Sequence, residues 1–170
     1  MRARRAGGVA AIAMALLLAT PTSASDSPAS ERLPTVSATI GSERFELEVA
    51  RDPVAQMRGL GGRNAIDRHG GMLFVFPDAQ PLAFVMRDCP IPIDVAFLDA
   101  RGRVINVHAM KPEAPRAPGE LAPDYEARLH PYPSALPARF ALEVAGGRLA
   151  ELGVQSGDKI ELDLPALTLR

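Results

Sequence analysis

The sequence predicts a mainly β (α+β) fold: an antiparallel, barrel-like sheet of about eight short strands with two short helices. Three observations lead to this expectation. Short segments alternate between apolar and polar residues, turn signals separate neighbouring segments, and helix signals occur only twice. Because adjacent hairpins pair antiparallel and few crossovers separate the strands, a curled antiparallel sheet is favoured over a doubly wound parallel one.

The individual elements follow from these signals in chain order. Asp52 before Pro53 predicts the N-cap and first position of a short helix that runs to about Arg58. Residues 147–152 predict a second short helix, and residues 110–137, rich in proline, predict a long irregular loop. The expected strands are 36–40, 45–49, 72–76, 82–86, 93–98, 104–108, 140–144 and 160–164.

The N-terminal region carries the pattern of an export signal. Residues 1–5 are basic, residues 9–19 form an apolar run, and small residues follow as far as Ala24. The apolar run is too short to span a bilayer as a helix, so a cleavable signal peptide is expected over residues 1–24. An uncleaved N-terminal anchor is the alternative. A disordered spacer is then expected over 25–34 and a single domain over 35–170, located in the periplasm or secreted, with no membrane span after cleavage.

Composition and charge exclude several classes of protein. The chain has 170 residues, 47% of them hydrophobic and 23% charged, which is typical of a globular domain. The formal net charge is −1, and removing the three arginines of the signal peptide leaves −4. An acidic domain without a Lys/Arg cluster is not expected to bind nucleic acid. The single cysteine excludes an internal disulfide, and no spacing of Cys and His predicts a metal site or a cofactor.

The most unusual stretch for a binding site is residues 84–94. Two prolines stiffen it, and its charged residues lie among residues apolar enough for a core. Asp94 opens a strand whose alternate residues look inward, so a buried carboxylate there needs a cation or several donors. It either pairs with an arginine to fix the fold or forms part of a wall that binds an anionic or hydroxyl-rich ligand. The candidate ligand-binding residues are Arg58, Arg63, Met86, Arg87, Asp88 and Asp94.

Two further residues, His108 and Cys89, are candidates for chemistry. The turn at residues 99–102 places His108 about level with Ile93 or Asp94, so Asp94 could orient His108 as a general base. A packed histidine is the plainer interpretation. Cys89 follows Asp88, whose charge opposes thiolate formation, and no resolving cysteine exists, so Cys89 is expected to be a small, half-buried residue.

The chain resembles a known family between Phe45 and Leu162. The resemblance rests on Arg58-Gly59-Leu60 with Arg63, on Gly71 to Phe76, on Phe84 to Arg87, on Ile91 to Asp99, and on Pro137 to Phe140 with Leu142-Glu143-Val144. These motifs, in this order, are similar to domain-of-unknown-function (DUF) family 192. The resemblance implies a compact, mostly β, barrel-like domain that is commonly exported, and it implies no activity. Relatives usually carry Asn and Thr where this chain has Asp88 and Cys89, which argues against Cys89 as an essential catalyst.

Three functions remain open from the sequence. The first is a non-catalytic periplasmic ligand-binding or accessory module, expected to be monomeric. The second is a structural partner of an envelope protein that uses the proline-rich loop as its contact surface. The third is a hydrolase or lyase with Asp94 and His108 as its acid–base pair.

Overall fold

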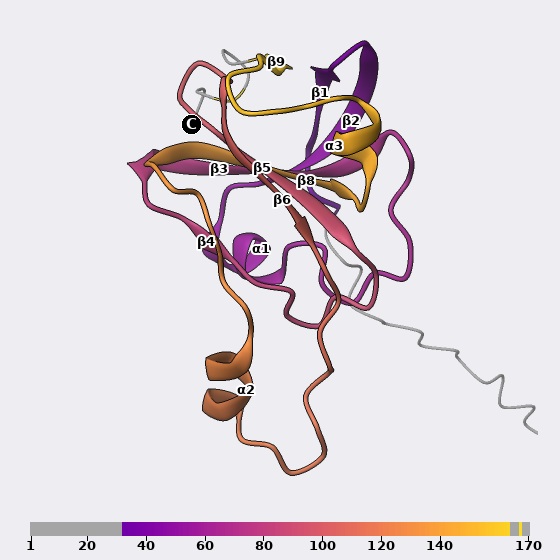
Figure 1. The fold of residues 1–170 in the computed structure, drawn as a ribbon, viewed down its shortest axis with the longest axis vertical. Helices are drawn as coiled ribbons and strands as arrows, with labels where there is room; N and C mark the ends of the chain where they lie inside the picture. Colours follow the sequence, from indigo (N-terminus) through magenta and orange to yellow (C-terminus); the bar gives the residue numbers. More distant parts are fainter. Residues whose placement is uncertain (1–31, 164–166, 168–170) are drawn as a thin grey trace, which may run out of the picture. The chain divides into compact units, whose positions relative to one another are not determined.

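The computed structural model describes residues 32–163 and Leu167, and the chain from Arg32 onward forms one compact unit. The expected signal peptide and most of the expected spacer lie outside the described residues. Within the described residues, no helix is long and apolar enough to cross a membrane. The mainly β fold is confirmed (Figure 1).

The described part of the chain forms nine strands, with three short helices between some of them. The strands are β1 (Thr35–Ile40), β2 (Glu43–Ala50), β3 (Gly70–Gln80), β4 (Ala83–Phe84), β5 (Ile93–Leu98), β6 (Val104–Met110), β7 (Tyr132–Pro133), β8 (Ala138–Ala145) and β9 (Glu161–Leu162). The helices are α1 (Pro53–Arg58), α2 (Ala122–Arg128) and α3 (Arg148–Glu151).

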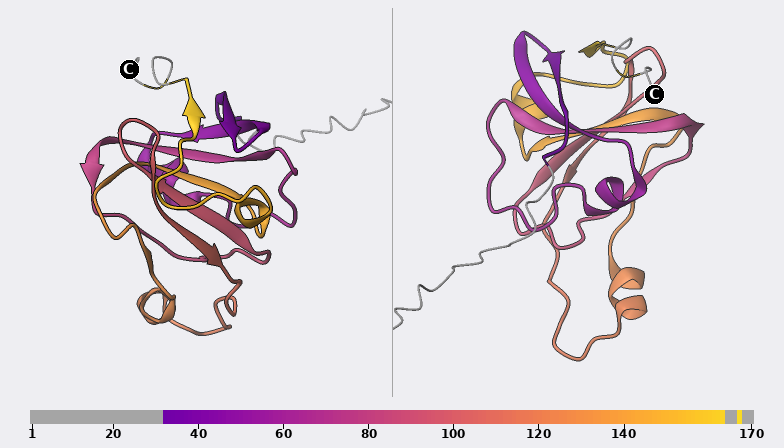
Figure 2. Two further views of the ribbon diagram at one scale, coloured as in Figure 1. Left: turned by 45° about the horizontal axis from the view of Figure 1, so that its top comes forward. Right: turned by 180° about the vertical axis from the view of Figure 1, so that it is seen from behind.

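Seven strands form one curled sheet in the order β6-β5-β8-β3-β2-β1-β9, and β4 pairs with β7 in a small second sheet. Figure 2 shows the curl of the large sheet from two further sides. Most neighbours are antiparallel, as predicted, and β5 has the predicted bounds. Strands β8 and β3 lie at the centre of the order, so residues on them have a neighbouring strand on each side.

Both faces of the large sheet are covered by apolar side chains. One face carries a core that includes Leu47, Leu73 and Leu142, under α3 and the C-terminal segment. The other carries a core that includes Phe74 and Phe97, which α1 and β4 adjoin (Figure 1). A strand between two cores has no solvent-facing side, which is why all six residues of β5 are buried.

Two features of the fold differ from the sequence prediction. β2 and β3 pair parallel, with Leu47 opposite Gly71, although an antiparallel sheet was expected. Residues 51–69, which include α1, return the chain from the end of β2 to the end of the sheet at which β2 begins. A connection of this length permits parallel pairing of β2 and β3. In addition, the stretch expected as an irregular loop contains α2 and β7, and only residues 83–84 of the predicted strand 82–86 are extended in a sheet.

Residues 111–131, which we call the arm, run out from β6 and return to β7 through α2 (Figures 1 and 2). Arg128 stabilises the arm through contacts with other residues of the arm. Its guanidinium donates hydrogen bonds to the backbone oxygens of Ala114 and Pro115 and pairs with the carboxylate of Glu120. The hydrogen bonds from Arg128 and from the Ala117 N–H lower the pKa of Glu120 to about 2. The arm is therefore a folded excursion rather than an irregular loop.

Candidate functional site

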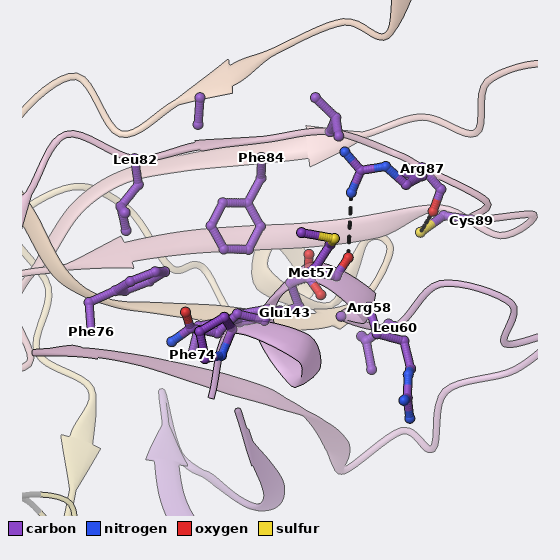
Figure 3. Close-up of a pocket in the computed structure, with 15 residues that line it drawn as sticks. Met57, Arg58, Leu60, Phe74, Phe76, Leu82, Phe84, Arg87, Cys89 and Glu143 are labelled. Carbon is purple, nitrogen blue, oxygen red and sulfur yellow. Dashed lines mark hydrogen bonds between the residues drawn. The ribbon is translucent and has the colours of Figure 1, made fainter. Parts of the chain in front are cut away.

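A pocket of about 340 Å³ lies beside α1 on the face of the large sheet that carries Phe74 and Phe97 (Figure 3). Segments distant in the sequence build it: α1 and the turn after it, the strands β3 and β8, and the residues from Leu82 to Cys89. Its lining residues are Pro53, Gln56, Met57, Arg58, Gly59, Leu60, Phe74, Phe76, Leu82, Ala83, Phe84, Val85, Arg87, Cys89 and Glu143.

The sequence of α1 explains how one side of the pocket is set. The Asp52 side chain accepts a hydrogen bond of 2.9 Å from the backbone N–H of Ala55, and Pro53 occupies the first turn, as predicted. The helix ends at Gly59, whose φ of 51° favours glycine. A Cβ there would lie 3.3 Å from Phe74 Cζ and 3.5 Å from Glu143 Oε2. Glycine thus keeps the helix end clear of the pocket floor.

Glu143 is the polar group of the pocket floor. It lies on β8 between Met72 of β3 and Val95 of β5, and only 5% of the residue is exposed. The backbone N–H of Leu60 donates to its carboxyl group, but Oε2 has no hydrogen-bond partner. Burial raises the pKa of Glu143 to about 8, against the lowering effects of the Leu60 hydrogen bond and of Arg63. The side chain is therefore mostly a neutral carboxylic acid at pH 7.

The walls of the pocket are mainly apolar. The Phe74 and Phe84 rings meet edge to face with their centroids 4.8 Å apart, and Phe76 and Leu82 continue the wall (Figure 3). Met57 lies between Phe84 and Arg87 in this view, and it is 72% exposed. An exposed methionine next to a pocket lined by aromatic rings forms a flexible apolar edge.

The rim is tied to the arm by two contacts. The Arg87 guanidinium forms a two-pronged ion pair with the carboxylate of Glu126 on α2 and donates a hydrogen bond of 3.4 Å to the backbone oxygen of Met57. Tyr125 donates through its hydroxyl to Asp88 Oδ1 at 3.1 Å and accepts from the Asp88 N–H at 3.0 Å. These contacts hold α2 against the stretch from Arg87 to Cys89.

The structure brings some of the sequence-predicted residues to this region. Arg58 and Arg87 line the pocket, and together with Asp88 they also line a second hollow of about 230 Å³. Arg63 does not line the pocket, and its guanidinium donates to both carboxylate oxygens of Glu48 at 2.6 and 2.7 Å. Met86 is buried in the core, at 1% exposure.

Asp94 and His108 are not brought together. Asp94 is buried with the core on the opposite face of the sheet, where its Oδ2 accepts a hydrogen bond of 2.9 Å from the Leu149 N–H at the start of α3. His108 pairs in register with Val95, one residue from the expected position, so its side chain lies on the other face from that of Asp94. The His108 Nε2 atom lies 2.8 Å from the backbone oxygen of Pro133. The hydrogen-bond partner of Asp94 is thus the backbone of α3 and not an arginine.

Cys89 lies at the edge of the pocket with a protonated thiol. Its Sγ donates to the backbone oxygen of Arg87 at 3.3 Å. Burial is the largest cause of a pKa of about 11 for the Cys89 thiol, and the carboxyl groups of Glu143 and Asp88 contribute to the same rise. A thiol with this pKa is a poor nucleophile at neutral pH. Among residues 32–163, no group of three or more His, Cys, Asp and Glu side chains is placed to hold a metal ion.

Glu143 was not a candidate in the sequence, although it is the central polar group of the pocket. Between Phe140, Leu142 and Val144 it has the pattern of the polar face of a half-exposed strand. Only the cover that α1 and the residues around Phe84 provide turns this face inward. A sequence signal was nevertheless present, because the family motif includes Leu142-Glu143-Val144.

Comparison with known proteins places the chain in a family. The solved structure of a protein of unknown function from Novosphingobium aromaticivorans DSM 12444 is similar, with 30% identity and a TM-score of 0.62, over 79% of this chain and 89% of that one. A second, from Sinorhizobium meliloti 1021, whose description suggests a transcription regulator, has 25% identity and a TM-score of 0.61, over 76% of this chain and 93% of that one. No curated protein matches the chain. The sequence pattern of DUF192, described as "Uncharacterized ACR", matches residues 36–162, and the chain therefore belongs to this family.

Proposed function

We propose that this protein is an exported, non-catalytic binding protein whose small-molecule ligand occupies the pocket above Glu143. The observation that carries the proposal is the buried carboxyl group of Glu143, whose Oε2 lacks a hydrogen-bond partner at the floor of a cavity with apolar walls. A buried polar atom without a partner costs about 1–3 kcal/mol, so proteins rarely keep one without a use.

The shape and lining of the pocket support binding of a small organic molecule. Its volume is at the lower end of the range found for such sites, roughly 300–1,000 Å³. Apolar walls supply affinity, and one or two polar groups fix the orientation of the ligand. Phe74, Phe76 and Phe84 provide the walls, and Glu143 provides a polar group.

Export is supported by the N-terminal sequence, with its basic start, apolar run and small residues up to Ala24. We expect the protein isolated from its producing cells to begin at Ser25. Intact-mass measurement checks this, and a mass that retains residues 1–24 would show that the leader is not removed.

A thermal-shift measurement with ethylbenzene tests whether the pocket binds an apolar molecule. A ligand that binds only the folded protein raises its melting temperature by mass action. Two exposed apolar residues of α1 offer matched variants: Met57 lines the pocket, whereas Val54 does not. In Met57→Trp the larger side chain should fill the edge of the pocket, and Val54→Trp is the control.

Ethylbenzene should raise the melting temperature of the wild type and of Val54→Trp by at least about 2 °C at concentrations well above its Kd. The shift in Met57→Trp should be less than half as large. Equal shifts in both variants, or no shift in any of the three proteins, would contradict binding in this pocket.

A further inference from the structure

The floor of the pocket presents a hydrogen-bond donor. The Leu60 N–H donates to the Glu143 carboxyl group, whereas Oε2 is buried and has no hydrogen-bond partner. Arg63, whose charge acts on Glu143, donates two of its N–H groups to the Glu48 carboxylate. No described cation forms a salt bridge with Glu143, so the carboxyl group keeps its proton near neutral pH. A carboxylic acid whose proton has no acceptor in the protein seeks one from a ligand.

The charges around the pocket disfavour a charged ligand. Arg58 and Arg87 both line the pocket, and their guanidinium groups oppose entry of a cation. Glu126 already pairs with Arg87, so the Arg87 guanidinium offers little to an anion. Removing an ionised group from water into apolar walls costs several kcal/mol unless the site pairs it. The pocket interior thus fits an uncharged molecule.

The walls favour a flat ring. Phe74 and Phe84 form an edge-to-face pair, and Phe76 lies beside them in the same view (Figure 3). Aromatic rings pack on one another in offset or edge-to-face geometry with a gain of about 0.5–1.5 kcal/mol beyond area burial. A ligand ring inserted here would extend the existing aromatic cluster.

We propose that the ligand is a small, uncharged ring compound whose carbonyl oxygen accepts a hydrogen bond from the carboxylic acid of Glu143. This deepens the proposed function and rests on it. Glu143 acts as the specificity-determining group, while the phenylalanines hold the ring by apolar contact. Compared with a pocket that has the same apolar walls but no Glu143 carboxylic acid, the site prefers ketone-like or amide-like acceptors to amines and to hydrocarbons of the same size.

Three probes of nearly equal size separate these chemistries: acetophenone carries a carbonyl, 1-phenylethylamine carries a cation, and ethylbenzene carries neither. Two variants separate the roles of Glu143. Glu143→Gln keeps a neutral donor, whereas Glu143→Leu keeps the approximate size and removes the donor. Dissociation constants are measured by ligand-observed NMR at pH 6 for the three proteins, each checked for folding by its melting transition.

The ratio of acetophenone affinity to ethylbenzene affinity is the diagnostic quantity, because it cancels changes in the apolar walls. We expect this ratio to fall about tenfold in Glu143→Leu and to change less than about threefold in Glu143→Gln, since a single hydrogen bond contributes roughly 0.5–1.5 kcal/mol. In the wild type the ratio should also fall as pH rises from 6 to 9, and it should stay constant in Glu143→Gln.

Two results would overturn this ligand class while leaving the proposed function standing. In the first, Met57→Trp weakens the binding of ethylbenzene, but the ratio of acetophenone affinity to ethylbenzene affinity is the same in Glu143→Leu as in the wild type. The other is a preference for 1-phenylethylamine that both Glu143 variants abolish, which would make Glu143 an anionic receptor for amines. If ethylbenzene and acetophenone both fail to bind the wild type, the proposed function fails as well.

Discussion

Glu143 shows how the surroundings of one residue decide its chemistry. Its neighbours in sequence, Leu142 and Val144, face one core, and Glu143 faces the other. Both sides of β8 are paired to other strands, so no sheet edge is near. Alternation in the sequence shows which face of the strand the residue occupies but not whether that face is covered. Its burial therefore could not be predicted from β8 alone.

The pH dependence of folding follows from the same residue. The pKa of Glu143 is raised from 4.5 to about 8 in the folded protein, so between these values the folded state binds more protons than the unfolded state. The free energy of unfolding accordingly falls as pH rises from about 5 to 8. Glu143→Gln removes this dependence, so it should gain several degrees in melting temperature relative to the wild type between pH 5 and 8.5.

Differential scanning calorimetry across this pH range checks the prediction. Taking the difference between variant and wild type cancels the titration of other groups. Glu161→Gln, which removes an exposed carboxylate of β9, is the control, and its melting temperature relative to the wild type should vary with pH less than that of Glu143→Gln. A constant offset between Glu143→Gln and the wild type would mean that Glu143 titrates near its ordinary pKa.

At the level of elements, capping and turn residues in the sequence predict α1 and the hairpin of β5 and β6, because these elements depend on contacts between residues close in sequence. The bounds of α1 follow from Asp52 and Pro53, and the hairpin of β5 and β6 follows from the turn at Asp99. Asp99 holds this turn with hydrogen bonds from the N–H groups of Arg101 and Arg103. Parallel pairing of β2 with β3 depends on contacts between distant segments, and no local pattern carries that information.

Local sequence signals do not predict the helix α2, for a different reason. Its N-cap is Leu121, which makes no side-chain cap hydrogen bond, and Pro123 lies in its first turn. Its anchors are long-range: Tyr125 and Glu126 contact Asp88 and Arg87 on the rim of the pocket. A short helix stabilised mainly by such contacts has no capping signature for the sequence to reveal.

Arg128 should control the order of the arm. Arg128→Ala removes the hydrogen bonds to Ala114 and Pro115 and the ion pair with Glu120, while the large sheet lies outside these contacts. We expect thermolysin to cut within residues 111–131 about fivefold faster in this variant, because cleavage follows the population of the locally open state. Arg101→Ala, in the exposed turn between β5 and β6, should leave the cleavage rate unchanged. Cleavage as slow as in the wild type would show that the rim contacts alone fix the arm.

At the level of the whole molecule, two cores on a single sheet explain where the pocket lies. The core with Leu47 and Leu142 is closed by α3 and the C-terminal segment. The core with Phe74 and Phe97 is completed by α1, β4 and the residues up to Cys89, and the pocket is lined by residues of these segments. The mainly β fold and the family were predictable from strand patterns and motifs. The pocket was not, because residues far apart in sequence build it.

The most direct test of a small-molecule pocket at this place uses the methionine methyl groups. The expected mature domain contains Met57, Met72, Met86 and Met110, and of these only Met57 lines the pocket. In protein labelled with ¹³C at the methionine methyls, titration with acetophenone should shift the Met57 resonance, assigned with Met57→Leu, along a saturating curve. The Met110 resonance should move little. A Met57 resonance that does not move at millimolar acetophenone, or that moves no more than that of Met110, would contradict the account.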